Sequence, residues 1–260
     1  MKIRKVRDLT LVTIDEQKTL VIACDSCGGV GMKEGDALKV SPQITGKFTA
    51  RVALLEVVCS GAEVVCVTNN VCNEMDDTGK LVQQGIIEEL EAAGVDQIVL
   101  TGSTEENFPT ISTGIGITVL GIAASSRLKV NQIHQDAELV VIGQPKVGAE
   151  ILTSQPGEIV AYDTIQYLLA QHDVCEIVPV GSKGIYYEAQ QLAAYNDATL
   201  VLKQNIKLDI KKSAGPCSVI LVAVTEAGLA SITALPYSVV IGKIVKKDRL
   251  NYVLTEPDGL

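Results

Sequence analysis

Residues 20–33 read Leu-Val-Ile-Ala-Cys-Asp-Ser-Cys-Gly-Gly-Val-Gly-Met-Lys, a short apolar run that passes directly into a glycine-rich segment. The run at 20–24 is typical of a buried strand. Asp25 stands at the point where this strand gives way to the glycines. The segment therefore predicts a buried strand whose carboxyl end carries an acid and a glycine-rich loop.

Alternating helix and strand signals follow in the first half of the chain. Apolar side chains recur at intervals of three and four residues through 44–60, which predicts a helix that Gly61 closes. Similar patterns predict a second helix at 78–93 and strands at 63–71, 97–101 and 115–122. This order favours an α+β or α/β fold with the helices packed on one side of a sheet.

A shift in composition at residues 123–135 separates the two halves of the chain, and we place a domain boundary there. The expected domains are residues 1–125 and 126–260. In the second domain, Gly181-Ser-Lys-Gly184 forms a glycine turn before a helix. The expected elements of this half are strands at 137–142, 176–180, 218–225 and 237–245 and helices at 162–171, 185–196 and 227–234.

Charge and hydropathy disfavour two classes of partner. The net charge of -9 opposes binding to nucleic acid. Basic residues gather at 203–212 and 243–249, where they alternate with apolar residues as on the solvated side of edge strands. Apolar stretches such as 219–224 are far shorter than the roughly 20 residues of a membrane span. We therefore expect no nucleic acid and no membrane among the partners.

Seven cysteines, an odd number, lie scattered in the chain, which favours reduced thiols in a cytoplasmic protein. Residues 1–10 agree, because they show no apolar core or cleavage site of a secretory signal. Cys24 and Cys27 form a Cys-x-x-Cys pair, which fits a redox pair or half of a zinc site. No second pair with ligand spacing exists in the sequence, so we favour two small packing residues beside Asp25.

The common signatures of nucleotide-binding and hydrolytic enzymes are missing from the sequence. No P-loop motif occurs, because Gly46-Lys47 and Gly242-Lys243 are followed by Phe48 and Ile244. No Gly-x-Gly-x-x-Gly or Gly-x-Ser-x-Gly occurs either, and the chain has only two histidines. P-loop, Rossmann and hydrolase functions are therefore disfavoured.

Five acidic residues stand near the ends of predicted strands or within the first helix. Carboxylate oxygens are the ligands that Mg²⁺ prefers, usually one or two per ion, with phosphates and water completing the shell. The group therefore fits a Mg-ATP site, although each acid alone is about as well explained as a surface carboxylate of an acidic chain. The five are Asp25, Asp36, Glu56, Glu105 and Glu106.

Three segments resemble the aminoimidazole ribonucleotide synthase superfamily, which also contains thiamine monophosphate kinase, selenophosphate synthetase and a hydrogenase maturation enzyme. Asp25 is followed at 29–33 by Gly-Val-Gly-Met-Lys, where the synthase has Asp-Gly-Val-Gly-Thr-Lys. The first helix ends at 56–62 with Glu-Val-Val-Cys-Ser-Gly-Ala, where the family has an acid before a Gly-Ala turn. Residues 101–104, Thr-Gly-Ser-Thr, stand where it has Gly-Gly-Glu/Asp-Thr. The resemblance covers nearly the whole chain.

The resemblance implies an α+β, two-domain aminoimidazole ribonucleotide synthase-like fold. Residues 1–125 would bind ATP and Mg²⁺ and pair their sheet with that of a second copy into a barrel at a dimer interface. Residues 126–260 would form a C-terminal α/β sandwich. The resemblance thus implies an ATP-dependent enzyme that works as a homodimer.

Carried over position by position, the resemblance also implies roles for single residues. Lys33 matches the lysine of the family's glycine-rich loop, and Glu56 matches the helix acid with one methylene more. Ser103 stands where the family has an acid, so Glu105 or Glu106 would replace that ligand. The expected metal ligands are Asp25, Glu56, Glu105 and Glu106, and the expected nucleotide contacts are Gly29, Gly31, Lys47, Gly102, Ser103 and Thr104.

Within the superfamily, residues 30–36 and 101–109 are most similar to α-ribazole kinases, which phosphorylate the 5'-hydroxyl of a benzimidazole nucleoside in cobamide (vitamin B12) salvage. In such a kinase the expected catalytic residues are Asp25, Lys33 and Asp36. Lys33 would balance phosphate charge, and Asp36 is a candidate general base or an ordinary loop carboxylate.

Three alternatives remain open at the level of the sequence. One is a thiamine monophosphate kinase of the same fold. Another is a non-catalytic nucleotide-binding protein, which Ser103 in place of an acid favours. The third is a purely structural interaction module, which would have no affinity for nucleotides.

Overall fold

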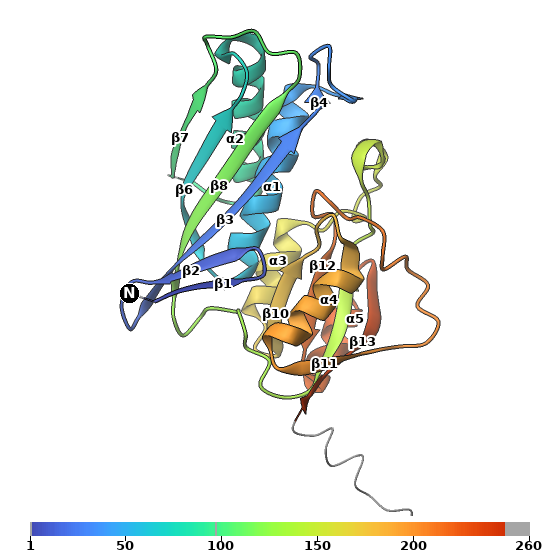
Figure 1. The fold of residues 1–260 in the computed structure, drawn as a ribbon. Helices are drawn as coiled ribbons and strands as arrows, with labels where there is room; N and C mark the ends of the chain where they lie inside the picture. Colours follow the sequence, from blue (N-terminus) through green and yellow to red (C-terminus); the bar gives the residue numbers. More distant parts are fainter. Residues whose placement is uncertain (1, 97, 248–260) are drawn as a thin grey trace, which may run out of the picture. The chain divides into compact units, whose positions relative to one another are not determined.

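The computed structural model of the protein describes residues 2–96 and 98–247 (Figure 1). The chain forms two compact units, Met1–Leu128 and Lys129–Leu260. Each unit combines a β-sheet with helices, so the predicted mixture of α and β structure is confirmed. Among the described residues, no helix has the length and apolar character needed to cross a membrane.

The first unit is built on a six-stranded sheet in the order β1-β2-β3-β8-β6-β7. Its strands pair antiparallel except β6 and β7, which are parallel. The elements of this unit are β1 (Ile3–Val6), β2 (Leu9–Thr13), β3 (Lys18–Gly28), β4 (Val30–Gly31), β5 (Leu38–Lys39), α1 (Pro42–Cys59), β6 (Glu63–Val71), the π-helical turn η1 (Met75–Gly79), α2 (Lys80–Ala92), β7 (Val99–Thr104) and β8 (Gly114–Ala124).

The helices α1 and α2 cover one face of this sheet (Figure 1). Alternate side chains such as Val21 and Ala23 of β3 and Ile117 and Val119 of β8 are buried beneath the helices. The other face of the sheet is only partly covered. The alternate residues of β3 and β8 that lie on it are half-buried or exposed. The predicted placement of both helices on one side of the sheet is therefore confirmed.

The sheet register fixes which residues share a row across the strands. Asp25 of β3 lies opposite Ile117 of β8, Ile117 opposite Asn69 of β6, and Asn69 opposite Gly102 of β7. Neighbouring strands are about 4.8 Å apart. The row therefore separates Asp25 from Gly102 of β7 by three strand spacings, which is roughly 14 Å.

Two glycines allow α1 and α2 to cross in backbone contact. A methyl group added at Gly85 of α2 would lie 1.8 Å from the carbonyl oxygen of Gln43, and one added at Gly46 of α1 would lie 2.2 Å from that of Val82. No real β-carbon tolerates such contacts with backbone, so any side chain here must push the helices apart.

We expect Gly85→Ala to lower the free energy of unfolding by about 2 kcal/mol or more, because overpacking outweighs the better helix propensity of alanine. Denaturation by urea, followed by circular dichroism, measures the change. Gln84→Ala, exposed on the same helix, is the matched control and should stay within about 0.5 kcal/mol of the wild type. Equal stability of the Gly85 variant would contradict backbone contact between the helices.

The second unit has an antiparallel five-stranded sheet in the order β10-β12-β9-β13-β11. The central strands β9 and β12 are buried at every position, so both faces of the sheet are covered. A hydrophobic core joins Ile185 and Leu192 of α4 to alternate residues of the strands. The elements are β9 (Ala137–Ile142), η2 (Gly148–Thr153), α3 (Tyr162–Ala170), β10 (Val174–Pro179), α4 (Gly184–Tyr195), β11 (Ala198–Leu202), β12 (Ile220–Val224), η3 (Glu226–Gly228), α5 (Leu229–Thr233) and β13 (Ser238–Lys246).

The basic segments of this unit differ from their predicted form. Residues 203–212 form turns after the edge strand β11 rather than the edge strand itself. Lys243 lies on β13, which pairs with β9 on one side and β11 on the other and is no edge. Its ammonium group is paired with Glu138 at 2.6 Å, so a charge in a central strand is compensated within the sheet. Residues 248 and 249 of the second segment lie outside the described residues.

All seven cysteines are free thiols. Cys24 and Cys27 are three residues apart on β3, and successive side chains of a strand point to opposite faces. Cys24 is exposed, whereas Cys27 lies on the helix side of the sheet near Thr49. The two thiols are therefore on opposite faces and form no pair. The prediction of two small packing residues fits Cys27, which is half-buried, but not Cys24, which is exposed.

Candidate functional site

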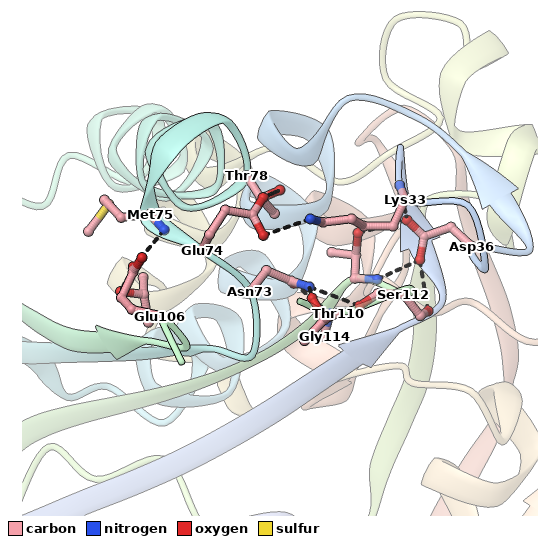
Figure 2. Close-up of polar contacts among 12 residues, drawn as sticks. Lys33, Asp36, Asn73, Glu74, Met75, Thr78, Glu106, Thr110, Ser112 and Gly114 are labelled. Carbon is pink, nitrogen blue, oxygen red and sulfur yellow. Dashed lines mark hydrogen bonds and ion pairs between the residues drawn. The ribbon is translucent and has the colours of Figure 1, made fainter. Parts of the chain in front are cut away.

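Polar side chains from three loops meet at the end of the first unit's sheet where β3, β6 and β7 terminate (Figure 2). The loops are residues 32–37, residues 72–79 and residues 105–113. We refer to these side chains as the Lys33 cluster. Its members are Lys33, Asp36, Asn73, Glu74, Thr78, Glu106 and Ser112.

Asp36 ties the first of these loops to the third. Its side chain is buried, and its carboxylate accepts hydrogen bonds from the backbone N–H of Lys33 at 2.8 Å, from the hydroxyl of Ser112 at 2.9 Å, and from the N–H and hydroxyl of Thr113, each at 2.7 Å. Burial opposes ionisation, but these bonds outweigh it and hold the pKa of Asp36 below its ordinary value. The geometry favours a structural role for Asp36 over the predicted role as general base.

Gly31 permits this close approach of the two loops. A methyl group at Gly31 would lie 2.2 Å from the hydroxyl oxygen of Thr113 and 2.7 Å from a carboxylate oxygen of Asp36. The neighbouring N–H of Gly29 donates to the carbonyl of Thr113 at 2.9 Å. Both glycines, predicted as nucleotide contacts, thus lie where the glycine-rich segment joins the Lys33 cluster.

Asp36→Asn should lower the free energy of unfolding at pH 7 by about 1–3 kcal/mol, because the amide loses the charge that four donors face. The folded-state pKa of Asp36 lies below the ordinary 3.8, so its stabilisation is complete above that value and is lost as pH falls through the folded-state pKa. Urea denaturation of both proteins at several pH values measures this. The difference between them should shrink below about pH 4, and a constant difference down to pH 2 would contradict the expectation.

Lys33 and Glu74 form an ion pair that links the first loop to the second. The ammonium nitrogen lies 2.6 Å from Oε2 of Glu74, and the hydroxyl of Thr78 donates to Oε1 at 2.5 Å (Figure 2). The two charged side chains are 24% and 35% exposed, so a ligand can reach both. Burial opposes ionisation, but the bonds from Lys33 and Thr78 keep the pKa of Glu74 below its ordinary value.

Asn73 fixes the backbone beside this pair. The side chain is fully buried, donates to the carbonyl of Ser112 at 2.9 Å and to the hydroxyl of Thr110, and accepts from the N–H of Gly114 at 3.0 Å. Sequence reasoning missed both Asn73 and Glu74. Both residues stand just after the predicted strand 63–71, and this position was the available signal. Polar residues at the end of one strand lie beside polar residues at the ends of the neighbouring strands.

Glu105 and Glu106, predicted as metal ligands, lie at the same end of the sheet. Glu106 accepts from the N–H of Met75 at 2.8 Å and from the hydroxyl of Thr104 at 2.7 Å. Glu105 accepts from the N–H groups of Asn107 and Phe108, and the bond from Asn107 is the main reason why its pKa is lowered. Glu105 therefore shapes the loop 105–113, and Glu106 links the end of β7 to the loop 72–79.

Asp25 and Glu56 lie elsewhere, in the layer between β3 and α1. Thr45 and Thr49 of α1 contact β4 and Cys27 of β3, respectively. Glu56 follows Thr49 by seven residues, two turns of helix, and so lies on the same stripe of α1. Burial is the main cause of the raised pKa of Asp25, and the negative charge of Asp8 adds to it.

The predicted metal ligands thus fall into two groups. Asp25 lies on β3 and Glu56 on α1, which packs on β3, whereas Glu105 and Glu106 follow β7. Because β8 and β6 lie between β3 and β7, the two groups are too far apart to share one cation. Within residues 2–96 and 98–247, no group of three or more His, Cys, Asp or Glu side chains is placed to hold a metal ion.

The remaining predicted nucleotide contacts are spread over two elements. Lys47 lies half-buried in the second turn of α1. Ser103 pairs with Asn70 across β7 and β6, with 3.5 Å between its hydroxyl and the amide oxygen, on the sheet face away from the helices. Gly102 faces Asn69 on the helix side, and Thr104 bonds to Glu106. The bond to Glu106 joins Thr104 to the Lys33 cluster.

Comparison with known proteins gives matches in structure only. No family model and no curated protein matches the sequence. A structure of T. maritima PurL complexed with ATP matches with a TM-score of 0.65 and 11% identity, covering 91% of this chain and 42% of that one. AaThiL complexed with AMPPCP and TMP matches with a TM-score of 0.63 and 15% identity over 92% and 84% of the two chains. The hydrogenase maturation protein HypE in complex with ATP gives 0.61 and 15% over 89% and 78%.

These three proteins are all of the aminoimidazole ribonucleotide synthase-like superfamily, so the predicted fold is confirmed at that level. At such low identity the matches show the fold alone. The chain spans less than half of the length of the PurL structures. The predicted barrel between two sheets stays a prediction.

Proposed function

We propose that the chain is an ATP-dependent kinase that phosphorylates the 5'-hydroxyl of α-ribazole in cobamide (vitamin B12) salvage. One observation carries the proposal: residues 30–36 and 101–109, the segments most similar to α-ribazole kinases, both contribute to the Lys33 cluster although they are distant in sequence. Lys33 bonds to Glu74, and Glu106 accepts from the N–H of the next residue, Met75. The likeness in fold to AaThiL with AMPPCP and to HypE with ATP supports the use of ATP.

Lys33 is the residue best placed to act on a phosphoryl group. Phosphoryl transfer depends mainly on positioning and on neutralising the charge of the transferred group. The ammonium group of Lys33 is held at a fixed point by Glu74 and remains accessible to a ligand. It would bind the transferred phosphate while the acceptor hydroxyl attacks in line. Lys47 stays a predicted second cation.

Carboxylates at the same end of the sheet as Lys33 fit Mg²⁺, which binds proteins through one or two carboxylates together with phosphate oxygens. Glu105 and Glu106 would hold the ion at this end of the sheet, and the lowered pKa of Glu105 means that its carboxylate is charged at neutral pH. Bound with ATP, Mg²⁺ would neutralise charge on the phosphates. Asp25 and Glu56 stay predicted ligands at a separate position.

Incubation with Mg-ATP and α-ribazole tests the proposal. We expect ADP and α-ribazole 5'-phosphate to form in equal amounts. A 5'-deoxy analogue of α-ribazole is the control, because it lacks the attacking oxygen and should give no phosphorylated product. Absence of both products from the complete mixture would remove the specific proposal.

Thiamine monophosphate kinase activity is the nearest alternative. It is favoured by AaThiL, whose bound ligands are AMPPCP and TMP and 84% of which this chain covers. The same assay with thiamine monophosphate separates the two. Formation of thiamine diphosphate at a higher kcat/KM than the α-ribazole product would replace the proposal by this alternative.

A protein that binds nucleotide without turnover is the second alternative. It is favoured by Ser103, which stands where the family has an acid and which lies beside Asn70 on the face of the sheet away from the helices. Tight binding of Mg-ATP in calorimetry, with no transfer to α-ribazole or thiamine monophosphate, would support it.

We also propose the homodimer that the resemblance implies. The sheet face opposite α1 and α2 carries half-buried apolar residues such as Leu20 and Ile22, and Val65 and Val99 are 40% and 63% exposed. A second sheet would cover this face. Sedimentation should give about twice the chain mass, and a mass of 27.6 kDa at micromolar concentration would contradict the dimer.

A further inference from the structure

The pair of Lys33 and Glu74 is anchored at both ends. The N–H of Lys33 donates to Asp36, and its carbonyl accepts from the ammonium group of Lys39. On the other side, the carbonyl of Glu74 accepts from the N–H of Gly79 at 2.9 Å. An ordinary surface ion pair loses entropy when two long side chains are held together. Here both backbones are already fixed, so less of that cost falls on the pair.

The segment that carries Glu74 has an unusual backbone. Within η1, Asp77 has φ of 71° and ψ of -67°, a conformation that side-chain-bearing residues rarely adopt. This turn brings the hydroxyl of Thr78 back to Oε1 of Glu74 and leaves Oε2 for Lys33. Strain of this kind persists only where surrounding contacts enforce it, and it often occurs at functional sites.

We propose that Glu74 is a positioning residue, which holds the ammonium group of Lys33 where the transferred phosphate binds and releases it to that phosphate when ATP arrives. This inference rests on the proposed kinase function. The ammonium group of Lys33 therefore donates to the carboxylate of Glu74 before ATP binds and to the transferred phosphate afterwards.

Kinetics give the first test. Glu74→Gln keeps the shape of the side chain and an oxygen for Thr78 but removes the charge. We expect kcat to fall about 10- to 100-fold while KM for ATP changes less than about threefold, because positioning is lost more than binding. Glu74→Asp should recover part of kcat. The matched control is Asp76→Asn, which removes an exposed partner of Lys80 and should leave kcat unchanged.

Chemical labelling gives a second test that needs no turnover. The rate at which an acetylating reagent modifies Lys33 is measured by peptide mass mapping, with the exposed Lys18 as internal reference. Glu74→Gln should raise the rate at Lys33 about fivefold, since the paired carboxylate no longer shields the amine. Mg-ATP should slow labelling of Lys33 in both proteins.

The outcomes separate the two proposals. If the wild type transfers phosphate and Glu74→Gln retains its kcat with intact folding, the role of Glu74 is overturned. If the wild type transfers no phosphate to any acceptor, the kinase function fails, and labelling decides whether Glu74 holds Lys33. An unchanged labelling rate in Glu74→Gln overturns the inference in either case.

Discussion

Glu89→Ala should lower the free energy of unfolding by about 3–5 kcal/mol, the cost of breaking a buried ion pair on one side only. Glu89 of α2 lies 3.1 Å from the guanidinium of Arg51 of α1, and the two side chains are 3% and 6% exposed. Removal of the carboxylate leaves the buried guanidinium without this counter-charge. The chain has no tryptophan, so urea denaturation is best followed by circular dichroism.

A double variant shows whether the charge is the cause. Arg51→Met with Glu89→Leu removes both charges and fills similar volume, so it should recover most of the loss. Asp76→Asn is the exposed counterpart, because its pair with Lys80 is 83% and 68% exposed, and it should cost less than about 1 kcal/mol. A Glu89→Ala protein within 1 kcal/mol of the wild type would show that the pair does not hold the helices together.

Lys33→Met should lower kcat/KM for phosphoryl transfer about 10²- to 10³-fold, the usual effect of removing one preorganised group that stabilises transition-state charge. Methionine keeps most of the length of the side chain but removes the charge that faces Glu74. Steady-state assays with Mg-ATP and the acceptor measure the change.

Two further variants sharpen that prediction. Lys33→Arg keeps a positive charge but changes the shape of the group, so it should recover only part of the activity. Lys18→Met removes an exposed lysine at the opposite end of β3 and is the control. Full activity of Lys33→Met would contradict the placement of phosphoryl transfer at the Lys33 cluster.

Strongly periodic segments of the sequence predicted their structure well. The strands at 63–71 and 137–142 have the bounds of β6 and β9, because short segments rich in valine are typical of strands. The first helix starts at Pro42 rather than at residue 44, since Ser41 caps it and accepts from the N–H of Gln43. The hairpin of β1 and β2 went unpredicted, because its residues mix basic and apolar side chains and its edge strand is largely exposed.

The residues of the site were harder to predict, because the order of the strands in the sheet decides which of these residues lie close together. All four predicted metal ligands stand near strand or helix ends, namely Asp25, Glu56, Glu105 and Glu106. The sequence does not reveal that β8 and β6 separate β3, which carries Asp25, from β7. Glu74 was missed for the same reason, since its partner Lys33 is 41 residues away. The glycine-rich loop and the segment 101–109 were recognised from motifs, and both contribute to the Lys33 cluster, Lys33 through Glu74 and Glu106 through Met75.

The position of a bound nucleotide tests the central claim most directly. A crystal structure with Mg-AMPPCP should show a γ-phosphate oxygen within about 3 Å of the ammonium nitrogen of Lys33, with the bond from Lys33 to Glu74 broken. Phosphates bound elsewhere, with that ion pair intact, would contradict phosphoryl transfer at the Lys33 cluster.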